Sequence, residues 1–319
     1  MITKTGTDIV VAAAHLRNGE IVAIPTETVY GLAGNALDDE AVIKIYEAKQ
    51  RPRFNPLIIH LPSIENAAEY VNEIPGPIRE LASVFSPGPL SYLLPKTARV
   101  PDLVTAGSDK VVIRIPAHPM TLELLRQLDF PLAAPSANPF GYVSPVTAEH
   151  VREGLNGRIS YILDGGPCSV GVESTILGIE GKDLVIHRVG GVSAEDIARV
   201  TGIMPTYSLL HEKPDTPGQL RSHYAPGKPL VVGHIDELVK KHAGRKVAVL
   251  SFSKQYEVSE CRVLSPKGDL HEAASRLFAT LRELDRSETE IILAEVFPDE
   301  GIGMAINDRL SRANSSVLN

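Results

Sequence analysis

The chain has 319 residues, of which 43% are hydrophobic and 22% are charged, as expected for a globular protein with room for two hydrophobic cores. Its formal net charge is −7, and neither residues 1–206 nor the remainder has an excess of Lys and Arg, which argues against a protein that wraps nucleic acid. No apolar stretch approaches the roughly 20 residues of a membrane-spanning helix. The two cysteines, Cys168 and Cys261, lie far apart, so we expect a reduced, cytoplasmic protein.

Strand and helix patterns alternate through the first two hundred residues, which is typical of an α/β fold. The expected strands are Ile21–Ile24, Leu57–Leu61, Leu90–Leu94, Val111–Ile115, Leu132–Ala134, Tyr161–Leu163, Ser174–Ile179 and Leu184–Arg188. The expected helices are Asp8–Arg17, Asp39–Ala48, Ile64–Val71, Pro77–Phe85, Met120–Leu128, Thr147–Gly154 and Ala194–Val200. The last two strands predict a hairpin, so we expect a mixed sheet rather than a purely parallel one.

The alternation breaks between Pro205 and Pro229, where prolines and glycines are frequent and indicate a linker. Beyond it, a second cycle predicts a small doubly wound α/β domain. Its strands are Leu230–Val232, Lys246–Ser251 and Ile291–Val296, and its helices are Asp236–His242, Leu270–Leu284 and Met304–Ala313. We therefore predict a large domain at 1–206, a linker at 207–228 and a small domain at 229–319. No catalytic constellation is visible in the small domain, and we expect it to have a regulatory or positioning role toward the large domain.

A basic segment, Lys49–Pro56, lies between an expected helix and an expected strand. Its two prolines fix their own φ angles and favour extended geometry in the residues before them, Arg51 and Asn55. A basic side chain on such a stiff backbone loses less freedom when it binds an anion, and junctions of this kind commonly carry ligand-binding loops. The alternative interpretation is a solvent-exposed basic turn.

Three further polar segments follow expected strands. Pro25–Leu32 offers two threonine hydroxyls and a carboxylate, Pro135–Pro139 holds a serine and an asparagine between prolines, and Asp164–Thr175 is rich in glycine. Singly, each is more readily explained as a structural turn. Together they predict a site for a small anion. The sequence contains no Walker-type phosphate loop, and the histidine spacing suggests no metal cage.

These motifs, in this order, resemble the YrdC-type domain of threonylcarbamoyl-AMP synthases. The resemblance rests on Pro25–Leu32, Lys49-x-Arg51, Asn55-Pro56-Leu57, Ser136-Ala137-Asn138 and Ser174-Thr175, and Thr216–Pro226 is similar to the linker of two-domain members. Gln219-Leu220-Arg221 departs from a Lys/Arg-rich pattern that many members carry there. The resemblance implies a YrdC-type twisted mixed sheet with flanking helices, followed by a small Rossmann-like doubly wound domain.

The resemblance also implies an activity: condensation of L-threonine, bicarbonate or CO2, and ATP to threonylcarbamoyl-AMP and pyrophosphate. The product would reach a downstream transferase complex that modifies tRNA adenosine. By motif match, the catalytic residues would be Lys49, Arg51, Ser136 and Asn138. ATP would contact Arg51, Asn55, Ser136, Ser144, Arg188 and Tyr224, with Tyr224 folding over the nucleotide as part of a lid. L-threonine would contact Thr28, His60, Arg114, Ala134 and Ser174. Mg²⁺ would accompany ATP, with no metal ligands from the protein.

Two other interpretations remain. Related domains have been discussed as modules that bind double-stranded RNA, but the acidic balance, the absence of Trp and the 5% aromatic content argue against extended RNA contact. We therefore expect no stable nucleic-acid binding and no membrane partner. A carbamoyl-transfer domain of the hydrogenase-maturation type shares the fold, but it occurs in larger chains with acylphosphatase and zinc-finger-like segments that are not visible here.

Overall fold

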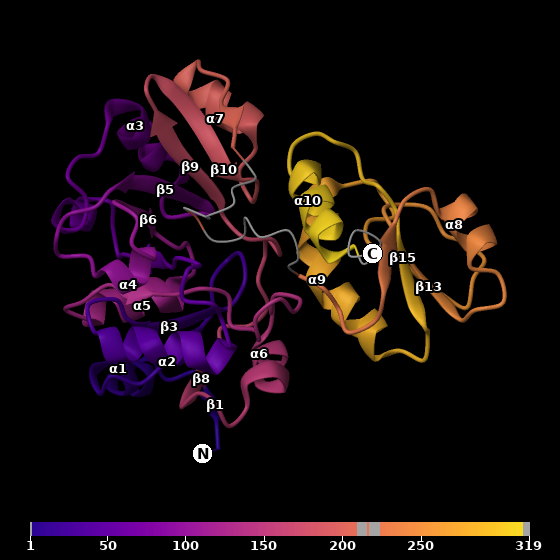
Figure 1. Cartoon of the computed structure of the whole chain (residues 1–319), viewed down its shortest axis with the longest axis horizontal. Coiled ribbons are helices and arrows are strands. Elements are labelled where there is room, and N and C mark those ends of the chain that lie inside the picture. Colours follow the sequence, from indigo (N-terminus) through magenta and orange to yellow (C-terminus); the bar gives the residue numbers. More distant parts are fainter. Residues whose placement is uncertain (1, 209–215, 217–223, 315–319) are drawn as a thin grey trace.

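The structure, a computed structural model, describes residues 2–208, 216 and 224–314. Two sheets divide these residues into a large N-terminal part and a small C-terminal part that lie beside each other (Figure 1). Most of the expected linker, 207–228, lies outside the described residues, so the domain boundaries at 206 and 228 stay a prediction. No described helix is both long enough and apolar enough to span a bilayer.

The large sheet has eleven strands in the described part of the chain, in the order β1-β8-β2-β3-β7-β4-β6-β5-β9-β10-β11. Some neighbours are parallel, such as β4 and β6, and others are antiparallel, such as β9 and β10, which confirms the mixed sheet and the hairpin. The strands are β1 Lys4–Gly6, β2 Val22–Ile24, β3 Gly31–Asn35, β4 Ile58–His60, β5 Leu90–Pro95, β6 Lys110–Arg114, β7 Leu132–Ala133, β8 Tyr161–Leu163, β9 Thr175–Glu180, β10 Asp183–Arg188 and β11 Thr206–Tyr207.

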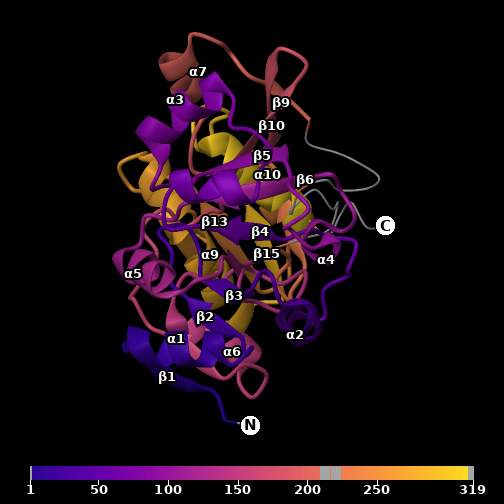
Figure 2. The ribbon, with the colours of Figure 1, turned by 90° about the vertical axis from the view of Figure 1, so that its left-hand side faces the viewer.

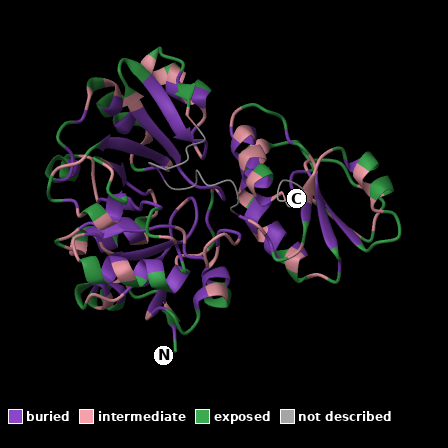
Figure 3. Cartoon of the chain, viewed as in Figure 1, coloured by how far each residue is buried: buried purple, intermediate pink, exposed green. Residues whose placement is uncertain are grey.

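Helices cover this sheet and bury their apolar faces against it (Figure 3). Their ends follow the expected capping chemistry: Asp8 accepts the backbone N–H of Val10 at 2.8 Å, and Gln50 ends its helix in the left-handed conformation. The helices are α1 Ile9–Arg17, α2 Asp39–Lys49, α3 Gly76–Phe85, α4 Asp102–Thr105, α5 Pro119–Gln127, α6 Ala148–Leu155 and α7 Ala194–Thr201, with a 3₁₀ helix at Glu65–Glu69.

Several short elements were not predicted from the sequence: β1, β3, α4, β11 and, in the small part, β14 (Glu260–Val263). The prediction of an α-helix at Ile64–Val71 was wrong, because the structure has only the 3₁₀ helix Glu65–Glu69 there. Strand β3 reads Gly-Leu-Ala-Gly-Asn, which has little intrinsic preference for a strand. It becomes one because β2 and β7 pair with it from either side.

The small part is a four-stranded parallel sheet in the order β12-β15-β13-β14, with β12 Leu230–Val232, β13 Val247–Ser251 and β15 Ile291–Ala294. Its helices are α8 Ile235–Lys241, α9 Leu270–Arg286 and α10 Gly303–Ala313. Alternate residues of β13 belong to different clusters: Ala248 and Leu250 pack with α9 and α10, whereas Val247 and Val249 pack on the side of α8. Helices therefore cover both faces of the small sheet, which confirms the prediction of a doubly wound domain.

Helices α9 and α10 face the large part, and α8 lies on the far side (Figure 1); in the view turned by 90°, α9 and α10 lie behind the large sheet (Figure 2). One hydrophobic cluster contains residues from both parts, among them Val172 and Phe278. Gly171 has a φ of +79°, and a Cβ there would collide with the backbone of Ala274 and Ser275 in α9. The two parts are therefore in close contact, with glycine required at the contact.

Candidate active site

A pocket opens in the large part where several strands of the mixed sheet end. Its walls come from β4, β6 and β10 and from the segments that follow β2, α2 and β7. The cavity volume is about 40 Å³. Three arginines and a single carboxylate give the wall an excess of positive charge, which suits an anionic ligand. The lining residues are Thr26, Val29, Gly31, Arg51, Ile58, His60, Arg114, Ala134, Pro135, Ser136, Glu173, Arg188 and Tyr224.

Arg51 is held on the loop between α2 and β4. Its Nε donates to the carbonyl oxygen of Asn55 at 3.2 Å, and its Nη2 donates to that of Pro56 at 2.9 Å. Burial lowers the pKa of Arg51 to about 10, so the guanidinium is still charged at neutral pH. Arg53, two residues later, is exposed, as expected. The loop therefore buries one of its two arginines in the pocket wall.

Lys49, the last residue of α2, lies beneath the Ser136 loop and is not part of the pocket lining. Its Nζ is 2.5 Å from the carbonyl oxygens of both Ser136 and Asn138. Burial lowers the pKa of Lys49 well below its usual range, and the nearby Arg51 lowers it further. The amine therefore positions the loop that carries the Ser136 side chain.

Asn55 and Asn138 are fully buried beside these loops. The Asn138 Nδ2 donates to the carbonyl oxygens of Pro139 and Tyr142, which holds the following turn in place. The Asn138 Oδ1 and both amide atoms of Asn55 have no hydrogen-bond partner in the described part of the chain. Buried amide groups are costly when they are unpaired, so these atoms are candidates for contact with a ligand.

His60 and Arg114 end the neighbouring parallel strands β4 and β6, where they are paired in register. Burial, followed by the charge of Arg114, lowers the pKa of His60 to about 3, so its ring is neutral at physiological pH. The Arg114 Nη2 donates to Glu27 Oε1 at 2.7 Å. Thr28 is behind the wall, with its hydroxyl 2.8 Å from that of Thr26.

Arg188, at the end of β10, lines the pocket, and Ser174 supports it from behind. The Arg188 Nε and Nη2 donate to the Ser174 carbonyl oxygen at 3.0 and 2.9 Å, and Nη2 also donates to the Ser174 hydroxyl at 3.0 Å. Burial lowers the pKa of Arg188 to about 10, which leaves it cationic at neutral pH. Ser144 donates its hydroxyl to Glu173 Oε1 at 2.6 Å.

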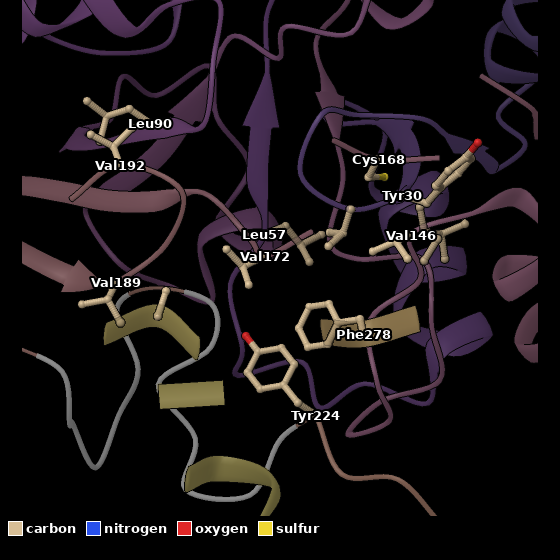
Figure 4. Close-up of a cluster of buried hydrophobic side chains, with 14 of the residues drawn as sticks. Tyr30, Leu57, Leu90, Val146, Cys168, Val172, Val189, Val192, Tyr224 and Phe278 are labelled. Atoms are coloured by element: carbon tan, nitrogen blue, oxygen red, sulfur yellow. The ribbon is translucent and has the colours of Figure 1, made fainter. Parts of the chain in front are cut away.

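Tyr224 closes the pocket from the side of the small part. It is 1% exposed, has a φ of +66°, and stacks on Phe278 of α9 with 5.7 Å between ring centroids (Figure 4). The guanidinium carbon of Arg309 in α10 lies 5.0 Å from the centre of the Tyr224 ring. Both aromatic and cationic contacts therefore hold the tyrosine in place.

Seven of the residues predicted to form the site line the pocket: Arg51, His60, Arg114, Ala134, Ser136, Arg188 and Tyr224. The others form a supporting layer, in which Lys49, Asn55, Thr28, Ser144 and Ser174 each hydrogen-bond a lining residue, and Lys49 links Asn138 to Ser136. The lining residues Thr26 and Glu173 were not predicted individually, although both lie in polar segments that follow expected strands, Pro25–Leu32 and Asp164–Thr175. In the described residues, no group of three His, Cys, Asp or Glu side chains could hold a metal ion.

Comparison with known proteins gives matches to both parts. Residues 14–190 match the family described as "Telomere recombination", and residues 192–315 match the family described as "Threonylcarbamoyl-AMP synthase, C-terminal domain". The chain is 42% identical to the threonylcarbamoyl-AMP synthase of Pyrococcus abyssi over 320 residues, which cover 95% of this chain and 93% of the relative. It is also 42% identical to the enzyme of that name from Bacillus subtilis over 316 residues, which cover 95% of this chain and 91% of the relative.

A solved structure is similar over both parts as well. The crystal structure of P. abyssi Sua5 complexed with L-threonine matches with a TM-score of 0.91 at 40% sequence identity. The match covers 98% of this chain and 96% of that one. The similarity therefore includes the arrangement of the two sheets as well as each sheet separately.

Proposed function

The chain belongs to the threonylcarbamoyl-AMP synthase family, and we propose that its cationic pocket condenses L-threonine, bicarbonate or CO2, and ATP to threonylcarbamoyl-AMP, with release of pyrophosphate. The observation that carries this proposal is the convergence of Arg51, Arg114 and Arg188 with the Ser136 loop in one pocket. ATP carries phosphate groups and L-threonine carries a carboxylate, and arginine pairs well with both.

The proposed chemistry asks the protein mainly to position its substrates. The threonine amine takes up CO2 as a carbamate, and a carbamate oxygen attacks the α-phosphorus of ATP while the bond to the pyrophosphate leaving group breaks. Fixed cations stabilise charge on the phosphoryl group at no cost of reorganisation. Arg51 and Arg188 fit this role because backbone carbonyls already hold them in place.

The two larger substrates divide these residues between them. We assign ATP to Arg51, Asn55, Ser136, Ser144, Arg188 and Tyr224, and L-threonine to Thr28, His60, Arg114, Ala134 and Ser174. Asn55, Ser144, Thr28 and Ser174 lie behind the lining and would act through the lining residues that they contact. Of the predicted catalytic residues, Arg51 and Ser136 would touch substrate, Asn138 offers its unpartnered Oδ1, and Lys49 would hold the loop that carries Ser136 and Asn138. The neutral ring of His60 suits a site that must contact an amino acid without adding charge.

Magnesium enters this proposal as part of the MgATP substrate. The only carboxylate in the described pocket lining, Glu173, already accepts from Ser144 and Arg309, so the protein offers no carboxylate cage for a cation. The ion would be held by the phosphates and would neutralise charge on them. Activity is expected to be lost in excess EDTA and restored by added Mg²⁺.

Tyr224 acts as a lid in this proposal. A cavity of about 40 Å³ is far below the roughly 300 Å³ or more of a small-molecule site, so the pocket must open before ATP enters, and movement of Tyr224 would open it. Closure over the nucleotide would then exclude water while the labile carbamate exists. Delivery of the product to a downstream tRNA-modifying transferase complex, and a location in the cytoplasm, remain predictions.

The alternative, an RNA-binding module without synthase activity, is less well supported. The acidic net charge argues against it, and the relatives that match 95% of the chain are synthases by name. Filter binding to tRNA at two salt concentrations tests it. Tight binding that weakens steeply with salt would revive the alternative.

The decisive experiment measures pyrophosphate release in CO2-free buffer with ATP alone, with L-threonine, with bicarbonate, and with both. Release that requires both additions is expected. Release with threonine alone would indicate ordinary amino-acid adenylation and would contradict the proposed function.

A further inference from the structure

One arginine of the small part reaches the pocket of the large part. Arg309 lies on α10 and is 1% exposed. Its Nε donates to Glu173 Oε2 at 2.7 Å, and its Nη2 donates to the Val189 carbonyl oxygen at 2.9 Å. Its guanidinium also lies over the Tyr224 ring. Arg309 therefore contacts two of the residues that line the pocket.

Its partner Glu173 is a buried carboxylate, which a nearby cation stabilises in the charged form. Glu173 is 6% exposed and is the only carboxylate among the described lining residues. Burial alone would raise its pKa, but Arg309, Arg188 and the hydrogen bond from Ser144 together outweigh burial, and the pKa lies below its usual range. The group is therefore an anion in a pocket whose proposed ligand is a triphosphate, and like charges at close range repel strongly in a poorly solvated site.

Both carboxylate oxygens of Glu173 are occupied: Ser144 donates to Oε1 and Arg309 donates to Oε2. The charges of Arg188 and Lys49 also act on this carboxylate. Among these cations, Arg188 is already bound to Ser174, and Lys49 donates to the Ser136 loop. Arg309 neutralises Glu173 by direct contact, with its Nε 2.7 Å from Oε2.

We propose that Arg309 is a positioning residue of the ATP site: by pairing with Glu173 it removes a negative charge from the pocket, and by packing on Tyr224 it supports the closed lid. The negative charge of Glu173 in the nucleotide pocket is then neutralised only when α10 packs against the large part. This inference rests on the proposed function, since it assigns ATP to this pocket.

Contacts elsewhere hold the two parts together without reaching the pocket. Arg286 of α9 pairs with Glu153, and Tyr142 donates its hydroxyl to Asp285 at 2.7 Å. Neither Arg286 nor Glu153 lines the pocket. Arg286→Met therefore serves as a control for the loss of an arginine–glutamate contact between the two parts, at a half-exposed site where Glu153 keeps Arg282.

The test compares Arg309→Met, Glu173→Gln and the double variant in the full chain. ATP affinity is measured by equilibrium titration, and KM is measured separately for ATP and for L-threonine. Arg309→Met is expected to weaken ATP binding and raise the KM for ATP about tenfold or more, with the KM for threonine within threefold. The double variant is expected to recover ATP affinity to within threefold of wild type, because it no longer contains the unpaired anion and the methionine side chain can still pack on the Tyr224 ring.

A purely structural role for Arg309 predicts a different pattern. A double variant that binds ATP as weakly as Arg309→Met would overturn the proposal, as would an Arg309→Met variant within threefold of wild type, or an equal loss in Arg286→Met. If Arg309→Met does not fold, the double variant decides, since removing both partners of a buried pair is much milder than removing one. Direct ATP titration needs no turnover, so a wild type that binds ATP but makes no product would contradict the proposed function without touching this result.

Discussion

The guanidinium of Arg114 lies 2.7 Å from Glu27 Oε1, and both side chains are largely buried. The second oxygen of Glu27 accepts the backbone N–H of Ala117 at 3.0 Å, which fixes the carboxylate from the other side. Arg114 lines the pocket, so the ion pair holds it in place before a substrate carboxylate arrives. Such preorganisation lowers the entropic cost of binding.

Glu27→Gln is therefore expected to raise the KM for L-threonine about tenfold, which corresponds to about 1.5 kcal/mol for a weakened hydrogen bond to a charged group. The KM for ATP should change less than threefold. Steady-state kinetics with each substrate varied in turn checks this, and Glu149→Gln, which removes a carboxylate from a surface pair with Arg152, is the control. Equal effects on both substrates would show that Glu27 supports the pocket as a whole.

Arg51→Ala is expected to cost about 2–4 kcal/mol of transition-state stabilisation, or about 30- to 1000-fold in kcat/KM, the usual range for one preorganised donor. Pyrophosphate release under saturating threonine and bicarbonate measures it. The exposed neighbour Arg53 provides the control, and Arg53→Ala should retain wild-type activity. Turnover of Arg51→Ala within threefold of wild type would refute the assignment.

Tyr224→Ala is expected to reduce product formation at least about tenfold, because the ring that closes the pocket is lost. Deleting residues 207–319 should impair synthesis for the same reason. Tyr207→Ala removes a tyrosine that is 43% exposed and should have little effect. An unchanged rate in Tyr224→Ala would rule out the lid role.

The lowered pKa of His60 implies that the free energy of unfolding depends on pH in a specific way. Its pKa is about 3 in the folded chain against about 6.5 when unfolded, so the unfolded state binds more protons between these values. The contribution of the neutral His60 ring to the free energy of unfolding is therefore fully present above about pH 6.5. It falls by at most about 1.4 kcal/mol for each pH unit as the pH drops toward 3. The difference in urea-unfolding free energy between wild type and His60→Gln should shrink from pH 7 to pH 4. A difference that is constant over this range would show that His60 titrates normally.

Gly171→Ala should destabilise the protein and reduce activity, because its φ is positive and the new Cβ would strike the α9 backbone. Gly181, with a φ of +63° and open space around it, is a matched control for the backbone strain alone. We expect a loss of about 1–2 kcal/mol for Gly181→Ala and about 3 kcal/mol or more for Gly171→Ala, measured by chemical unfolding. Equal losses would mean that the contact with α9 adds nothing.

Much of the fold followed from local patterns. Hydrophobic periodicity predicted the long helices, the buried strands and the β9–β10 hairpin, because each depends on residues close in sequence. The pattern failed for β3 and β14, which have weak strand composition and exist because neighbouring strands pair with them. The same local patterns placed polar loops after strands, and these loops do meet in one pocket.

The sequence by itself therefore determined the two sheets, the polar loops and, through its ordered motifs, the family. The tertiary structure alone decided which of those residues face the pocket and which support it from behind. Lys49 illustrates this, since its position in the sequence suggested a substrate contact while its amine is bound to the Ser136 loop. Arg309 illustrates it more strongly. It lies 136 residues from Glu173, and no local pattern relates two charges that meet only when a helix of one part packs against a loop of the other.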